Sequence, residues 1–396
     1  MRTQKVNFIG EAFAKTLRIS TFALLLVVAI SCKKESKDAI LTPTYINFVY
    51  TSDAHYGITR ATFQGATTVN AQIVNAALVK QINTVSDLTL PNDGGVKAGS
   101  KVGGINFLIE TGDVSNRMEA GIQSATASYN QFITDYSTGL KLTDDAGVKT
   151  KLLLLPGNHD VSNAIGYYKT MTPLTDAGSM AGIYNLMNIG AVKTVANYNY
   201  TTDKIHYSVD YSGFHFLFVC MWPDSTERVW INKDLATVTN PVLLFTHDQP
   251  DVETKHLFNP NVSGTINSTN KFENLVGEKC KDGLTITAPS TIEQRNFASW
   301  IKVNPLIKAY FHGNDNANEF YSYTGPDNNI SLNTFRVDSP MKGNISGTDE
   351  TKLSFQLVTI DVVNKSMTVR ECLWNTTPTV PTTAIVFGAT KTISLK

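Results

Sequence analysis

The sequence predicts an α/β fold, and two observations lead to this prediction. Short apolar runs bounded by Gly, Pro, Asn or Asp are typical of buried strands. Five such runs occur, at residues 45–51, 105–109, 152–155, 242–245 and 307–311. The stretches between the first of them are long enough for crossover helices, which we expect within residues 69–85 and 125–136. A chain of 396 residues, 42% of them apolar, is also large enough to bury its own core.

Two further pairs of strands are predicted to be antiparallel. Residues 206–209 and 214–221 flank a short polar turn, and residues 355–363 and 366–373 alternate in polarity around Asn364-Lys365. A two-residue polar turn between alternating runs is typical of a hairpin. The C-terminal half of the chain therefore adds antiparallel strands to the predicted sheet structure.

Helical spacing of apolar residues is present at residues 230–235 and 292–303. Between them, residues 251–290 are rich in Asn, Thr, Gly and Lys and show little periodicity. This segment separates two clusters of polar residues that follow predicted strands. We therefore expect it to be an insertion that rims the functional site.

Composition excludes several classes of protein. The apolar content is that of an ordinary globular chain, so a disordered, collagen-like or coiled-coil protein is excluded. Lys plus Arg and Asp plus Glu number 34 each. Without a basic excess, nothing would attract the phosphates of DNA or RNA, and no nucleic-acid partner is expected.

The N-terminus has the pattern of an export signal. A positively charged start precedes an apolar run at residues 22–30, which is too short to span a bilayer. The small residues that lead to Cys32 resemble a bacterial lipoprotein signal, which would make Cys32 the lipidated first residue of the mature protein. We therefore expect a signal peptide at residues 1–31, a polar tether at 32–44, and a lipoprotein on the periplasmic or surface face of the cell envelope.

The remainder is predicted to be one domain at residues 45–375 with a C-terminal extension at 376–396. Three cysteines follow the lipidated one: Cys220, Cys280 and Cys372. An odd number permits at most one disulfide among them, and the sequence leaves open whether it forms.

Polar side chains gather at the ends of the predicted strands, where ligands bind in open α/β sheets. Asp53 and His55 follow the first run, Asp113 the second, Asn158 the third and His247 the fourth. Carboxylate, imidazole and amide oxygen donors suit two divalent cations that share a bridging carboxylate. Such a pair of cations can clamp the attacking and leaving oxygens of a phosphoryl displacement.

These residues resemble the calcineurin-like metallophosphoesterase family. Its motifs D-x-H, G-D-x-x, G-N-H-D/E and a later H match four segments of this chain: Asp53-Ala54-His55, Gly112-Asp113-Val114-Ser115, Gly157-Asn158-His159-Asp160 and Thr246-His247. The resemblance covers about residues 45–373. It implies two central sheets packed face to face with helices outside them.

The resemblance also implies a role for each residue. Asp53 and His55 would hold the first metal, Asn158 and His247 the second, and Asp113 would bridge both. His159 would contact the substrate, either by protonating the leaving-group oxygen or by stabilising charge on the phosphate. Arg117 lies where some branches of the family carry an arginine that binds phosphate, a role that suits a guanidinium.

Two positions depart from the family pattern. Asn116 lies where purple acid phosphatases have tyrosine and protein-phosphatase-type members have aspartate. The final G-H-x-H motif is replaced by Gly313-Asn314-Asp315-Asn316, so both imidazoles become amides, and His312 precedes the glycine. Either Asn314 and Asn316 are metal ligands, or one metal and its catalysis have been lost.

Amide oxygens are weaker ligands for Zn²⁺ or Fe²⁺ than imidazole is. The donor set therefore favours Mn²⁺, with Mg²⁺, Ca²⁺, Zn²⁺ and Fe²⁺ as alternatives. The sequence predicts a membrane-tethered hydrolase of phosphoester bonds that acts on a phosphorylated small molecule or lipid. The alternative is a surface protein that has lost catalysis and binds a phosphorylated ligand in the same pocket. The sequence leaves the oligomeric state open.

Overall fold

The computed structural model describes residues 43–116, 123–161, 177–199, 202–252, 291–380 and 383–396. The predicted signal peptide, Cys32 and most of the predicted tether lie outside these ranges, as do Cys280 and nearly all of the segment 251–290. Among the described residues, every helix is too short or too polar to cross a bilayer.

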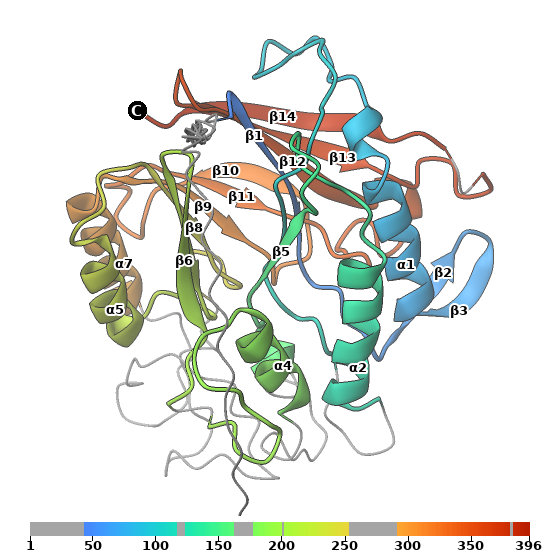
Figure 1. The fold of residues 1–396 in the computed structure, drawn as a ribbon, viewed down its shortest axis with the longest axis horizontal. Coiled ribbons are helices and arrows are strands. Elements are labelled where there is room, and N and C mark those ends of the chain that lie inside the picture. The colour runs from blue at the N-terminus through green and yellow to red at the C-terminus, as the bar shows by residue number, and fades with distance from the viewer. Residues whose placement is uncertain (1–42, 117–122, 162–176, 200–201, 253–290, 381–382) are drawn as a thin grey trace, which may run out of the picture. The chain divides into compact units, whose positions relative to one another are not determined.

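Two six-stranded sheets form the centre of residues 42–396 (Figure 1). The strands of the first sheet lie in the order β14 (Val386–Ser394), β13 (Ser366–Leu373), β12 (Ser354–Asp361), β1 (Tyr45–Thr51), β4 (Phe107–Glu110) and β5 (Lys151–Leu154). Within it, β1, β4 and β5 run parallel, whereas β12 and β13 form the predicted hairpin. Residues 376–396, predicted as an extension, contribute the edge strand β14.

The strands of the second sheet lie in the order β10 (Glu319–Tyr323), β11 (Leu332–Arg336), β9 (Ile307–His312), β8 (Val242–Phe245), β7 (Phe214–Val219) and β6 (His206–Tyr211). Within this sheet, the adjacent strands β7, β8 and β9 run parallel. Strands β6 and β7 form the second predicted hairpin. Ser212 and Gly213 at its turn both have positive φ, which matches the right-handed twist of the two strands.

The two sheets pack face to face through aromatic side chains. Phe48 of β1 makes edge-to-face contacts with Phe216, Phe245 and Phe311 of the second sheet, with ring centroids 5.9–6.0 Å apart. Such contacts add to the free energy gained by burying the rings. The strands that contribute are buried along nearly their whole length, because helices cover their other faces.

Helices cover the outer faces of both sheets (Figure 1). On the first sheet lie α1 (Ala71–Ile82) and α2 (Ala125–Phe132), the latter followed by a π-helical turn at Ile133–Thr138, with α4 (Gly178–Leu186) packed against α2. On the second lie α5 (Ser225–Leu235) and α7 (Thr291–Val303), whose Ile231 and Phe297 pack against Leu217 and Leu244. The predicted fold class, an α/β arrangement of two packed sheets with helices outside, is confirmed.

Side-chain caps explain where three of the helices begin. Asn70, Ser124 and Asp224 each accept a hydrogen bond from a backbone N–H three residues on, at 3.1, 3.1 and 2.7 Å. A small hairpin of β2 (Thr59–Phe63) and β3 (Ala66–Asn70) precedes α1. Cys220 and Cys372 are buried free thiols.

Candidate metal centre

The loops that follow β1 and β4 are joined by their backbones. The N–H of Asp53 donates to the carbonyl of Gly112 and that of His55 to the carbonyl of Asp113, both at 2.8 Å. Asp53, His55 and Asp113 have φ of 60°, 46° and 55°, a left-handed conformation that is uncommon for residues other than glycine. Such strain is typical of functional sites, where the surrounding structure fixes the side chains in place.

The loop after β5 leads into the single turn α3 (Asn158–Val161). Its Asp160 accepts hydrogen bonds from the backbone N–H groups of Gly157, Val114 and Ser115 at 2.9–3.1 Å. The buried Asp160 carboxylate therefore fastens this loop to the loop that carries Asp113. A Cβ at Gly157 would collide with Asp113 and with the His247 ring, so only glycine permits this close approach.

The second sheet contributes His247, which follows β8. Its Nδ1 atom lies 2.9 Å from the carbonyl oxygen of Thr111 and its Nε2 atom 2.9 Å from Oδ1 of Asn158. A hydrogen bond from Nδ1–H to the Thr111 carbonyl leaves Nε2 with a lone pair, the form in which histidine binds metals.

Asp113 lies at the centre of the cluster. Its Oδ2 atom is 3.6 Å from Nε2 of His55 and 3.6 Å from Nε2 of His159, while Oδ1 is 3.5 Å from Nε2 of His247. Nε2 of His55 is also 3.4 Å from Oδ1 of Asp53. Two groups of potential ligands result, His55–Asp113–His159 and Asp53–Asp113–His247, which share Asp113.

Two features of these side chains fit a divalent cation. Oδ1 of Asn158 faces only hydrogen-bond acceptors, with His247 Nε2 at 2.9 Å and the Asp113 oxygens at 3.0 and 3.1 Å. Adjacent ligands of an ion bound at about 2.1 Å lie about 3.0 Å apart in an octahedron. An amide turned by 180° would also satisfy these acceptors. However, Oδ1 of Asp53 is buried without a hydrogen-bond partner among the described residues, and a bound cation would supply one.

The electrostatics of the cluster lead to the same conclusion. Burial, followed by the negative charges of Asp53 and Asp160, raises the pKa of Asp113 well above its usual value. Packing several carboxylates together away from water is unfavourable unless positive charge offsets them. A divalent cation would provide this charge and keep Asp113 ionised at neutral pH.

The loop after β9 brings Asn314 and Asn316 to the margin of the cluster. The backbone N–H of Asn314 donates to Oδ2 of Asp53 at 2.9 Å, while its side-chain amide donates to Gln249 at 3.1 Å. The Asn316 amide donates to the Asn314 carbonyl at 2.8 Å, and its Oδ1 is buried without a hydrogen-bond partner in the described part of the chain. Asn314 thus contacts the cluster through its backbone N–H, and whether either amide oxygen binds a metal stays a prediction.

His312 is engaged elsewhere. Its ring nitrogens lie 2.9 Å from the Gly313 carbonyl and 2.9 Å from the Tyr321 hydroxyl. Burial lowers its pKa to about 3, so the ring is neutral at physiological pH. Arg117 lies outside the described residues.

Sequence reasoning missed two residues at the site. One is Asp160, part of the Gly157–Asp160 motif, which had no assigned role. The other is Lys342, whose Nζ atom lies 3.1 Å from Nε2 of His159, with Nδ1 of that ring 3.2 Å from the Asn116 carbonyl. Lys342 belongs to no recognisable motif and follows His159 by 183 residues, so no local signal marks it.

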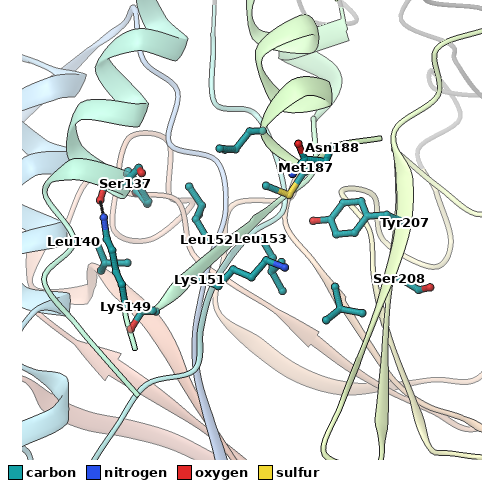
Figure 2. Close-up of a pocket in the computed structure, with 14 residues that line it drawn as sticks. Ser137, Leu140, Lys149, Lys151, Leu152, Leu153, Met187, Asn188, Tyr207 and Ser208 are labelled. Atoms are coloured by element: carbon teal, nitrogen blue, oxygen red, sulfur yellow. Dashed lines mark hydrogen bonds between the residues drawn. The ribbon is translucent and has the colours of Figure 1, made fainter. Parts of the chain in front are cut away.

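A separate cavity of about 500 Å³ opens between the edge strands β5 and β6 (Figure 2). Tyr207, Met187 and Leu152 line it, with Lys149 and Lys151. The Tyr207 hydroxyl caps the open edge of β5 by hydrogen bonds with the N–H and carbonyl of Leu154, at 2.9 and 3.1 Å. None of the cluster residues lines this cavity.

No family model matches the chain, and no curated protein matches it. Several solved structures resemble it, including the following two. A conserved uncharacterized protein from Streptococcus pneumoniae, described as a predicted phosphoesterase, is 8% identical with a TM-score of 0.32, over 89% of this chain and 99% of the other. A single mutant of Vps29 from Entamoeba histolytica is 10% identical with a TM-score of 0.30, over 83% of this chain and 93% of the other. A likeness at TM-scores this low assigns no function to the chain.

Proposed function

We propose that this protein is a metal-dependent phosphoesterase. The observation that supports this most strongly is the pair of buried ligand groups, His55–Asp113–His159 and Asp53–Asp113–His247, which share Asp113. Asp53, His55 and Asp113 would hold one divalent cation, and Asp113, Asn158 and His247 a second. The oxygen-rich donor set favours Mn²⁺.

Divalent cations in such a site act as Lewis acids toward phosphoryl oxygens and lower the pKa of water. The residues of this chain supply the remaining functions. His159, held through Nδ1 at the Asn116 carbonyl, presents Nε2 toward the cluster, where it would hold or deliver the proton that a leaving alkoxide requires. Burial of the cluster excludes bulk water and strengthens each of these interactions.

We further propose that the substrate is a phosphorylated small molecule or lipid, and that lipidation at Cys32 tethers the enzyme to the membrane of the bacterial cell envelope. The sequence pattern at residues 1–32 supports the tether. Acyl chains insert into the bilayer without any polypeptide crossing it, so a lipoprotein-type N-terminus would hold the catalytic domain close to the membrane.

The test is to measure metal content and turnover on one preparation of the full chain. We expect up to two Mn²⁺ per chain and hydrolysis of p-nitrophenyl phosphate or its bis-ester. Asp113→Asn keeps the size of the side chain but removes the shared charge, and it should lose bound metal and turnover together. A wild-type chain that binds no metal and hydrolyses neither ester under Mn²⁺, Mg²⁺ or Zn²⁺ would contradict the proposal and favour a binding protein for phosphorylated ligands.

A further inference from the structure

Lys342 brings a positive charge to the margin of the acidic cluster. It lies in the connection between β11 and β12, is half-buried, and places Nζ 3.1 Å from Nε2 of His159. Its charge also opposes the rise in the pKa of Asp113. The ammonium group is therefore close to both the proposed proton donor and the carboxylate that the two ligand groups share.

The loop that carries Lys342 is fastened to the site at its first residues. The Ser339 hydroxyl donates to the Asp53 carbonyl at 2.8 Å and accepts from the backbone N–H of Lys342 at 2.9 Å. The position of the Lys342 backbone is thereby linked directly to the loop that holds Asp53.

Two more contacts hold the same loop. Asn344 donates through its backbone to the Asn316 carbonyl at 2.7 Å and through its side chain to the Asp315 carbonyl at 2.6 Å. From β2, the buried Arg60 donates to the carbonyls of Pro340, at 3.0 Å, and Ser346. A lysine on a loop held in this way loses less conformational entropy when it binds a ligand than one on an unsupported loop.

A phosphoryl group that enters this site brings several negative charges with it. The proposed cations would share their charge with the buried carboxylates of Asp53 and Asp113, which leaves charge on the phosphoryl oxygens for other groups to offset. The Lys342 ammonium can only donate, so Nε2 of His159 accepts from it at 3.1 Å, and a phosphoryl oxygen that approaches Nε2 also comes within reach of this ammonium. Ammonium groups bind phosphate as compact point charges.

We propose that Lys342 binds the anionic oxygens of the phosphoryl group beside His159. This inference rests on the proposed function, because it requires that a phosphorylated ligand enters the cluster. It gives a binding role to the connection between β11 and β12. This connection follows the segment Gly313–Asn316, where amides replace the imidazoles of the family motif.

The test uses the full-length, Mn²⁺-loaded protein with inorganic phosphate as the probe. Lys342→Gln removes the charge but keeps hydrogen-bonding capacity, Lys342→Arg keeps the charge, and Lys352→Gln removes an exposed lysine ten residues on. Calorimetry should show that phosphate binds at least about tenfold more weakly to Lys342→Gln, with most of the affinity retained in Lys342→Arg and all of it in Lys352→Gln. The KM for p-nitrophenyl phosphate should rise in parallel, while metal content stays unchanged.

Unchanged phosphate affinity in Lys342→Gln would overturn the inference, as would a wild-type chain that fails to bind millimolar phosphate. Extra bound metal in Lys342→Gln with unaltered phosphate affinity would also overturn it, since the ammonium would then be competing with a cation. A wild-type chain without turnover, whose phosphate affinity nevertheless depends on Lys342, would refute the proposed catalysis and support the anion site.

Discussion

The imidazole rings of His55 and His159 stand edge to face, with centroids 4.8 Å apart and planes at 84°. The Nε2 atoms of both rings lie 3.6 Å from the same oxygen of Asp113. Their other surroundings differ, because His55 also faces Asp53, whereas His159 contacts Lys342 and the Asn116 carbonyl. One carboxylate oxygen thus organises two histidines for which we predict separate roles.

His159→Gln should keep its metal and lose turnover. The expected fall in kcat is about 10²–10⁴-fold, the usual contribution of a general acid. His55→Gln should instead lose metal, since His55 faces Asp53 as well as Asp113. Measuring the metal content of each variant together with its kcat separates the two roles. Loss of metal from His159→Gln would make His159 a ligand, as its place in the His55–Asp113–His159 group also permits.

Asn316→His should tighten the binding of Zn²⁺ relative to Mn²⁺, because imidazole is a better ligand for zinc than an amide oxygen. Competition between the two ions, followed by a fluorescent chelator, measures the preference. Asn328→His is the matched control: Asn328 is exposed and has φ of 51°, close to the 50° of Asn316, so it carries the same backbone cost. An unaltered metal preference in Asn316→His would remove Asn316 from the ligand set.

Gly157→Ala should weaken metal binding and destabilise the fold by about 1–3 kcal/mol, the usual cost of forcing an extra methyl group into a packed site. The added Cβ would collide with Asp113 and His247. Gly213→Ala serves as a control, since that glycine has φ of 81° but no neighbouring atom within 4 Å. It should cost stability alone. Equal metal affinities for the two variants would contradict the predicted collision.

Asp338→Asn should flatten the dependence of stability on pH. Burial raises the pKa of Asp338 from 3.8 to about 7, so between these values the folded chain holds a proton that the unfolded chain releases. The free energy of unfolding of the wild type therefore falls as pH rises through this window, by up to about 4 kcal/mol. Urea titrations at pH 4.5, 6 and 8 would measure the slope. If the unfolding free energy of Asp338→Asn depends on pH as steeply as that of the wild type, Asp338 is not the group that causes the dependence.

The fold was predictable largely because its signals are local. Apolar runs bounded by turn residues correspond to β1, β5, β8 and β9, and the alternation around Asn364 corresponds to the β12–β13 hairpin. The edge strand β14 escaped prediction, since six of its nine residues are exposed and its sequence lacks a buried apolar run. Where tertiary pairing alone defines a strand, local patterns give little indication of it.

The clustering of Asp53, His55, Asp113 and His247 was also predictable, because each follows a strand directly and parallel strands deliver their ends to one edge. Lys342 was not, since its approach to His159 depends on how Ser339, Asn344 and Arg60 hold one loop. The hydrogen bond from the Asn314 backbone to Asp53 was equally hidden. A sequence motif specifies which side chains are present, whereas the path of the loop determines which of their atoms reach the site.

His247 follows a strand of one sheet, and its neighbours Asn158 and Asp113 follow strands of the other. A cation bound by all three would act as a cross-link between the halves of the sandwich and would be absent from the unfolded chain. Free cation at a hundred times its Kd would then add about 2.7 kcal/mol to the unfolding free energy. The melting temperature of this protein should therefore rise with the concentration of free cation. It should fall when a chelator is added, even when no substrate is present.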